Sequence, residues 1–101
     1  MPEMYFQVCW PDGVVQRCYS PSTIVEDFFT PGTAYPLKEF VERSRMALGI
    51  ACERVRAVYG VPSRAATGQL AEIESAAARY ADMDGAKVTV EALLDAYGNV
   101  R

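Results

Sequence analysis

The 101-residue chain contains no histidine. This absence removes the Ser-His and Cys-His nucleophile pairs, the histidine general base and the histidine metal ligand together. The sequence also lacks a phosphate-binding loop, a glycine-rich nucleotide fingerprint and a nucleophile elbow. We therefore predict no catalytic residues, no cofactor-binding residues and no metal site.

Cysteine is scarce and shows no paired pattern. Cys9, Cys18 and Cys52 are odd in number and include no C-x-x-C motif, so neither a disulfide framework nor a zinc knuckle is indicated. We expect reduced, mostly buried thiols. Cys9 is the better redox candidate, because the hairpin described below puts it on the face turned away from the core.

Long apolar runs and an excess of basic residues are also missing. No run approaches the ~20 residues of a membrane span, and the first three residues do not begin a signal peptide, so we expect a cytoplasmic protein without membrane contact. The formal net charge of −3 disfavours a nucleic-acid partner. Because half of the residues are apolar, residues 1–101 fit a single domain, with a core expected over residues 3–91.

The longest periodic segment runs from Pro36 to Gly60 and predicts a helix. Pro36 suits the first helical position, and Gly60 marks the end. A second helix is expected over residues 64–82 after a Ser63 N-cap, and its alanine-rich face favours antiparallel packing on the first. Apolar or small residues line one side of the first helix at three-and-four spacing: Leu37, Phe40, Val41, Ser44, Leu48, Ala51, Cys52, Val55 and Tyr59.

Residues 4–10 alternate as a half-buried strand does, and Pro11-Asp12-Gly13 then predicts a hairpin turn. A three-residue loop would point one set of side chains at the core: Met4, Phe6, Val8, Trp10, Val14 and Cys18. The opposite face is too aromatic for an ordinary wet surface and too polar for a core. We interpret it as a contact surface formed by Tyr5, Gln7, Cys9, Val15, Arg17 and Tyr19.

The remaining segments complete an α+β fold of order β-β-α-α-α-β. Residues 22–29 predict a short helix with a Thr23 and Glu26 capping box, although an extended conformation stays open, and residues 30–35 form a turn-rich link. Residues 86–91 predict a third strand beside the hairpin, while residues 92–101 form a last helical turn or a loose tail. The expected architecture is a small antiparallel sheet, made of the hairpin and the third strand, packed against two long antiparallel helices and one short helix.

The first long helix repeats a Glu-Arg-x-Arg pattern after 11 residues. Eleven residues are close to three turns, so Arg43 stacks above Arg54, and Arg45 above Arg56, ~16 Å apart. Such a stripe is an anion-binding or acidic-partner surface, or a solvated face with Glu–Arg pairs worth ~0.3 to 0.5 kcal/mol each. In a variant of the second interpretation, one arginine turns inward and bonds a carboxylate from the sheet edge.

A set of short motifs spans about residues 1–91: Trp10-Pro11-Asp12-Gly13, Cys18-Tyr19-Ser20-Pro21-Ser22, Thr30-Pro31-Gly32, Ala34-Tyr35-Pro36, Phe40, Ala47-Leu48, Glu53-Arg54-Val55-Arg56, Tyr59-Gly60, Gln69-Leu70 and Ile73-Glu74. With these motifs the chain resembles a small bacterial family of nitrogen-starvation-response proteins encoded in gene clusters with a nitrilase. The resemblance implies a bacterial cytoplasmic setting linked to nitrogen metabolism, with nitrile or cyanide assimilation as a candidate. It supplies no established activity, cofactor or catalytic residue.

Two hypotheses of function follow. The first is a non-enzymatic accessory or interaction protein, either a homodimer or the partner of a protein from the same gene cluster. Its contact surface would come from Tyr5, Gln7, Cys9, Arg17, Tyr19, Arg43, Arg45, Arg54 and Arg56. The alternative is a binder or small enzyme that holds an anionic small metabolite between sheet and helix, with Arg17 or Arg54 and the tyrosines as ligands.

Overall fold

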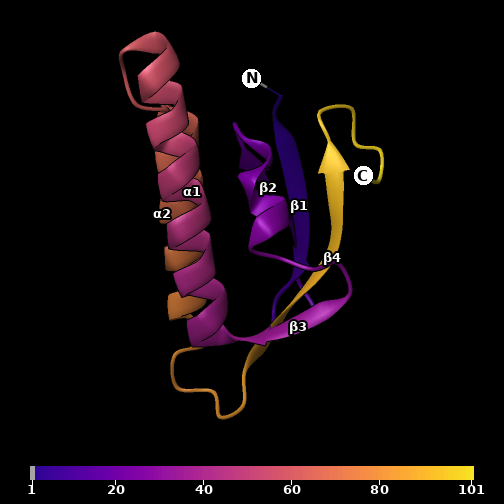
Figure 1. Ribbon diagram of the computed structural model, residues 1–101. Coiled ribbons are helices and arrows are strands. Elements are labelled where there is room, and N and C mark those ends of the chain that lie inside the picture. The colour runs from indigo at the N-terminus through magenta and orange to yellow at the C-terminus, as the bar shows by residue number, and fades with distance from the viewer. Residues whose placement is uncertain (1) are drawn as a thin grey trace.

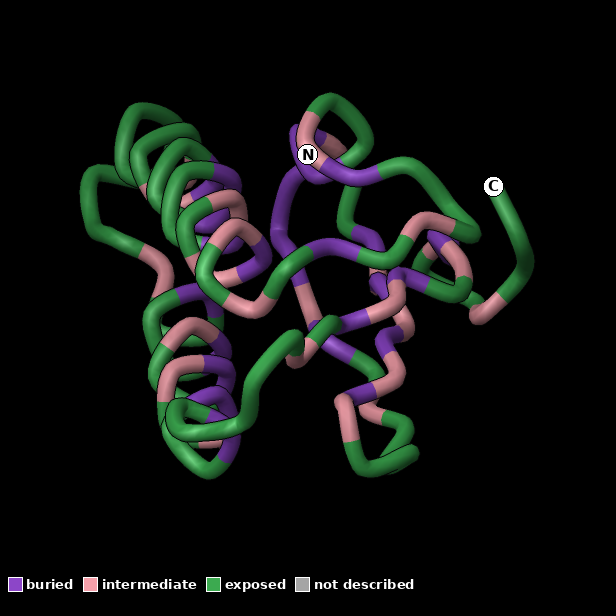
Figure 2. The backbone as a smooth tube through the Cα atoms, turned by 90° about the horizontal axis from the view of Figure 1, so that it is seen from below, coloured by how far each residue is buried: buried purple, intermediate pink, exposed green. Residues whose placement is uncertain are grey.

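A four-stranded antiparallel sheet and two long helices make up the α+β fold of the computed structural model, which describes residues 2–101 (Figure 1). Both helices lie on one side of the sheet, and no helix of the described chain covers the other side (Figures 1 and 2). The strand order is β2-β1-β4-β3. In chain order the elements are β1 (Met4–Cys9), β2 (Val15–Ser20), the 3-10 helix η1 (Thr23–Asp27), β3 (Thr33–Pro36), α1 (Leu37–Tyr59), α2 (Arg64–Ala78) and β4 (Lys87–Asp95).

The predicted hairpin and its register are confirmed. Phe6 lies opposite Cys18 in the β1–β2 ladder, and the Trp10 N–H donates to the Val14 carbonyl across the turn at 2.8 Å. The prediction that Val14 faces the core is wrong, because this residue lies in the turn, one position ahead of β2, and is 52% exposed. The other residues predicted for the inner side are buried: Met4, Phe6, Val8, Trp10 and Cys18.

The predicted third strand is confirmed as β4, which pairs with β1. Its predicted end at Glu91 is wrong, since the strand continues to Asp95. A β-bulge explains the error: Val8 pairs with Val90 and Gln7 with Ala92, so Glu91 has no residue opposite it. The extra residue reverses the alternation, and the core-facing positions change from even to odd numbers.

A fourth strand, β3, occupies part of the segment that we predicted to be a turn-rich link. Tyr35 lies opposite Val88 of β4, and the Gly32 N–H donates to the Val90 carbonyl at 2.7 Å. Four residues are too few for alternation to be visible in the sequence. Pro36 is tolerated because β3 is an edge strand, where a missing N–H need not break a ladder.

The predicted short helix is the 3-10 helix η1, so the chain has two α-helices rather than three. The predicted capping box is also wrong, because the N-cap is Ser22, whose side-chain oxygen accepts a hydrogen bond from the Ile24 N–H at 3.2 Å. Ile24 and Val25 are buried, and η1 packs against α1. The segment is therefore a short capped turn that contributes two apolar side chains to the core.

Helix α1 follows the predicted pattern with corrections at both ends. Pro36 is the N-cap and the last residue of β3, not the first helical residue. Gly60 ends the helix in the left-handed conformation, with φ of 81°, as its position predicted. Tyr59 does not join the core; it is exposed on the last turn. Neither helix of the described residues is both long and apolar enough to cross a membrane.

Helix α2 packs antiparallel to α1, as predicted (Figure 1). Its Ser63 cap is confirmed, since the hydroxyl oxygen accepts from the Ala66 N–H at 3.1 Å, but the helix ends at Ala78 rather than near residue 82. Gln69 has a role that the pattern did not reveal. Its buried side-chain oxygen accepts from the Tyr19 N–H at 2.9 Å, so α2 satisfies a donor on the open edge of β2.

Aromatic rings join the layers of the core. Phe40 of α1 lies 5.5 Å from the ring of Trp10 and 5.3 Å from that of Phe29, measured between centroids. Phe29 also contacts Phe6 at 5.7 Å, and Tyr80 stacks on Trp10 at 5.8 Å. Such ring pairs contribute ~0.5 to 1.5 kcal/mol beyond their buried area. The cluster therefore ties α1 to the sheet and to the segment that follows η1.

Two buried serines provide a test of this packing. The Ser44 hydroxyl on α1 has no hydrogen-bond partner among residues 2–101, whereas the Ser20 hydroxyl donates to the Ser22 carbonyl at 2.7 Å. Ser44→Ala should leave the free energy of unfolding unchanged or raise it by up to about 1 kcal/mol, because it removes an unpaired buried polar group. Ser20→Ala should lower the free energy of unfolding by about 1 to 2 kcal/mol.

Urea unfolding of the two variants measures both effects. Equal destabilisation by Ser44→Ala and Ser20→Ala would contradict the assignment, since it would require a bonded hydroxyl at Ser44.

Candidate functional site

The four arginines predicted to form one stripe on α1 have different partners. Arg43 is an anchor for the chain between β2 and β3. Its Nη1 donates to the Phe28 carbonyl at 2.8 Å, its Nε pairs with Glu39 at 3.0 Å, and its guanidinium lies 5.1 Å from the Tyr35 ring centroid. A charged donor on a carbonyl is stronger than a neutral one, so Arg43 holds this segment against the helix.

Arg54, three turns further along α1, contacts the other end of the same segment. Its Nη1 donates to the Ser22 hydroxyl oxygen at 2.9 Å. No carboxylate within residues 2–101 forms an ion pair with it. The 11-residue repeat therefore places two arginines on one side of α1, where they bond a carbonyl and a hydroxyl rather than a carboxylate from the sheet edge.

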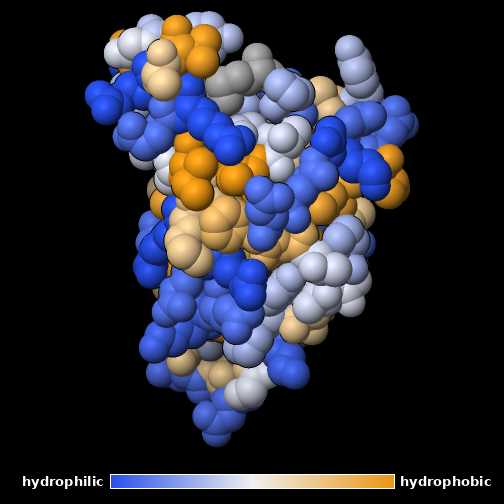
Figure 3. Space-filling model, in the orientation of Figure 1, coloured by the Kyte–Doolittle hydropathy of each residue, from blue (hydrophilic) through white to orange (hydrophobic). Residues whose placement is uncertain are grey.

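Arg45 and Arg56 have acidic partners elsewhere. Arg45 pairs with Glu74 of α2 at 2.7 Å, and Arg56 pairs with Glu53 of its own helix at 3.2 Å. The solvent side of α1 is partly apolar, because it exposes Met46, Gly49, Ile50 and Ala57. In Figure 3, hydrophobic side chains gather on the front of the molecule, where α1 meets the segment after β2, with hydrophilic ones above and below.

The other predicted surface is the outer face, which we define as the side of the β1–β2 hairpin turned away from the helices. Tyr5, Gln7, Cys9 and Tyr19 are half-buried there, whereas Val15 and Arg17 are exposed. The Tyr5 and Tyr19 rings meet edge to face with centroids 5.6 Å apart. The alternation of the sequence thus brings the predicted hairpin residues together.

Polar bonds tie the outer face to its surroundings. The Tyr19 hydroxyl donates to Glu3 at 2.8 Å, and Gln7 accepts from Arg17 at 3.4 Å while it donates to Glu91 at 3.1 Å. Burial, followed by the hydrogen bond to Glu3, raises the pKa of Tyr19 to about 12. The phenol therefore stays protonated at neutral pH and remains a donor.

The C-terminal turn covers one end of this side of the sheet. Leu94 lies opposite Tyr5 and is buried, and the Asp95 carboxylate accepts from the N–H groups of Tyr97 and Asn99 at 2.9 Å each. The bond from Asn99 is the main reason that the pKa of Asp95 is lowered. The segment predicted as a last helical turn or loose tail is a strand end followed by a bonded turn.

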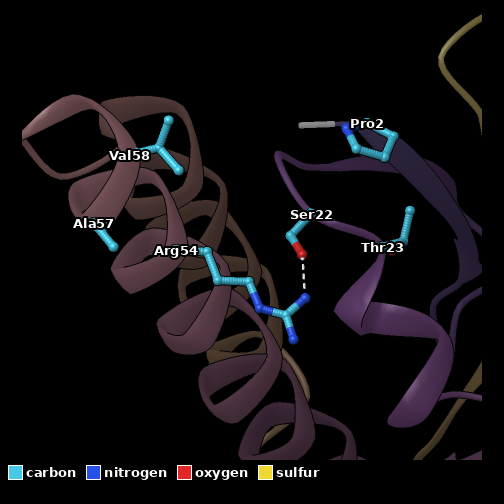
Figure 4. A pocket seen from close by; sticks show the side chains of 6 residues that line it. All are labelled: Pro2, Ser22, Thr23, Arg54, Ala57 and Val58. Carbon is cyan, nitrogen blue, oxygen red and sulfur yellow. Dashed lines mark hydrogen bonds between the residues drawn. The ribbon is translucent and has the colours of Figure 1, made fainter.

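A groove lies between α1 and the start of η1, on the helix side of the sheet. It has a volume of about 320 Å³ and is lined by Pro2, Ser22, Thr23, Arg54, Ala57 and Val58. Figure 4 shows the Arg54 side chain extending from α1 to Ser22, below Pro2 and Val58. The sequence predicted Arg54 as a candidate but not Ser22 or Thr23, because no local pattern indicates contact between segments 32 residues apart.

The two surfaces lie on opposite sides of the sheet. Arg17 belongs to the outer face and Arg54 to the groove, so the two arginines cannot hold one ligand together. Burial raises the pKa of Cys18 to about 12, which keeps this thiol protonated, and Cys9 is half-buried on the outer face. Within residues 2–101 no cluster of three Cys, Asp or Glu side chains is arranged to hold a metal ion.

Comparisons with known proteins give one family. The model of the family described as "Nitrogen starvation-induced protein NitG" matches residues 5–93, from β1 into β4. No curated protein and no solved structure is significantly similar to the chain. The match includes the outer-face residues and all four arginines of α1.

The arginine contacts predict unequal effects on stability. Arg43→Ala should lower the free energy of unfolding by about 1 to 2 kcal/mol, because it leaves the Phe28 carbonyl without its donor. Arg56→Ala, on the same helix, removes only an exposed pair and should change it by less than about 0.5 kcal/mol. Chemical denaturation compares the two variants, and equal losses would show that Arg43 has no anchoring role.

Proposed function

The chain belongs to the NitG family of nitrogen starvation-induced proteins, and on that premise we propose that it is a non-enzymatic interaction protein of nitrogen metabolism. The outer face is its contact surface, and a second copy of the chain is the occupant. The observation that carries this proposal is the one-sided covering of the sheet. Both helices pack on the inner face, so no helix of the described chain covers the outer face, where the half-buried Tyr5 and Tyr19 rings meet beside the C-terminal turn (Figure 2).

The charges of the outer face favour self-association. Arg17 lies on β2, whereas Glu91 lies on β4, beyond β1. A two-fold axis parallel to the strands would bring the hairpin of one copy over β4 of the other. Arg17 of each copy would then approach Glu91 of its partner. Aromatic side chains with few charges are also typical of the centre of protein interfaces.

The chain offers a matched pair of variants for this interface. Val15 is 53% exposed on the outer face, and its neighbour Val14 is 52% exposed but lies in the turn, ahead of β2. We expect the wild-type protein to have twice the 11.1 kDa chain mass by light scattering. Val15→Glu should give the monomer mass, because it buries a carboxylate in the interface, whereas Val14→Glu should remain dimeric.

Circular dichroism should show that both valine variants stay folded. A wild-type monomer at the highest soluble concentration would refute self-association. A dimer that persists in Val15→Glu would place the interface elsewhere.

We further propose a nitrilase from the same gene cluster as a partner of this dimer, because the family that the sequence resembles implies such a cluster. We expect the purified nitrilase and the chain to form a complex that elutes before either component in gel filtration. A nitrilase from an unrelated cluster serves as the control and should not bind. Separate elution of the two proteins would refute the nitrilase link, whatever the oligomeric state of the chain.

A further inference from the structure

We propose that the groove between α1 and η1 is a binding site for a small organic monocarboxylate, with the Arg54 guanidinium as its anion ligand. This site is distinct from the outer face and lies on the other side of the sheet. The groove volume of about 320 Å³ falls at the small end of the range for ligand pockets, which is roughly 300 to 1,000 Å³.

The charge of Arg54 is the first reason for this assignment. The other three candidate arginines on α1 are each neutralised by a glutamate, namely Glu39, Glu74 and Glu53. Arg54 alone among those four makes no ion pair within residues 2–101, and its single side-chain bond is to Ser22. A guanidinium has five N–H donors, so several remain for a fork-like pair of bonds to a carboxylate.

The surroundings of Arg54 are the second reason. Ser22 is 3% exposed, and its hydroxyl oxygen also accepts from the Ile24 N–H at 3.2 Å, so it is a fixed acceptor that orients the guanidinium. A charged side chain that already has its binding conformation in the free protein loses less conformational entropy when the ligand binds. Ser22 acts here as a positioning residue and Arg54 as the binding residue.

The walls define the rest of the ligand. Pro2, Ala57 and Val58 present apolar atoms to the groove, and Thr23 adds a methyl group beside its hydroxyl (Figure 4). One arginine neutralises one negative charge, and a chain with net charge −3 repels polyanions. The ligand class is therefore a monoanion with a short aliphatic or aromatic body, not a phosphate or a nucleotide.

Benzoate and benzamide separate the charge from the body of such a ligand. We expect titration with sodium benzoate to shift the amide NMR signals of Thr23 and Val58 in the full-length wild-type protein. Benzamide has the same ring without the charge and cannot form the charge-assisted fork. Its affinity should therefore be lower than that of benzoate by a factor of about ten or more. Inorganic phosphate at matched ionic strength should not compete.

Arg54→Gln should weaken benzoate binding about tenfold or more, whereas the matched control Arg56→Gln, two residues along the same helix, should leave it unchanged. If Arg54→Gln unfolds, Arg54→Lys keeps the charge without the fork and should show a smaller loss. Three results would overturn the proposal: no signal shift with benzoate, equal binding of benzamide, or equal affinity in the wild type and Arg54→Gln. Competition by phosphate would overturn the ligand class.

Discussion

The packing of Phe40 against Trp10 and Phe29 is the contact on which the rest of the structure depends. It joins a helix, the hairpin and the loop after η1 with three rings. Because α1 and α2 pack side by side on this cluster, they cover one face of the sheet and leave the other without a helix. The division of the molecule into a helix side with a groove and an outer face without helices follows from this single layer.

Helix α1 covers the sheet and also holds the short η1 segment in place. Its arginines donate hydrogen bonds to residues beside η1, which has few hydrogen bonds of its own. A five-residue 3-10 helix has few internal hydrogen bonds. Arg43 and Arg54 donate to Phe28 and Ser22, which flank it at either end. The segment is thus held at both ends by charged donors, and the groove beside Arg54 has a wall of fixed geometry.

Local chemistry explains which features the sequence could predict. The hairpin register follows from the turn Pro11-Asp12-Gly13, and alternation then brings Tyr5 and Tyr19 to one face. The bulge at Glu91 and the short edge strand β3 depend on pairing with distant chain, so no local periodicity indicated them. The contact between Arg54 and Ser22 was also not predictable from local sequence. The 11-residue repeat predicted the helix face on which Arg54 lies, but not that its hydrogen-bond partner is Ser22.

Strand β2 is the element that belongs to both surfaces. It contributes Arg17 and Tyr19 to the outer face, and the chain after Ser20 leads directly to Ser22 in the groove. Displacement of β2 is opposed at this point by two bonds, from the Tyr19 N–H to Gln69 and from the Ser20 hydroxyl to the Ser22 carbonyl. The groove and the outer face share no residue, because they lie on opposite faces of the sheet. The proposed ligand and the proposed partner would therefore not compete for the same side chains.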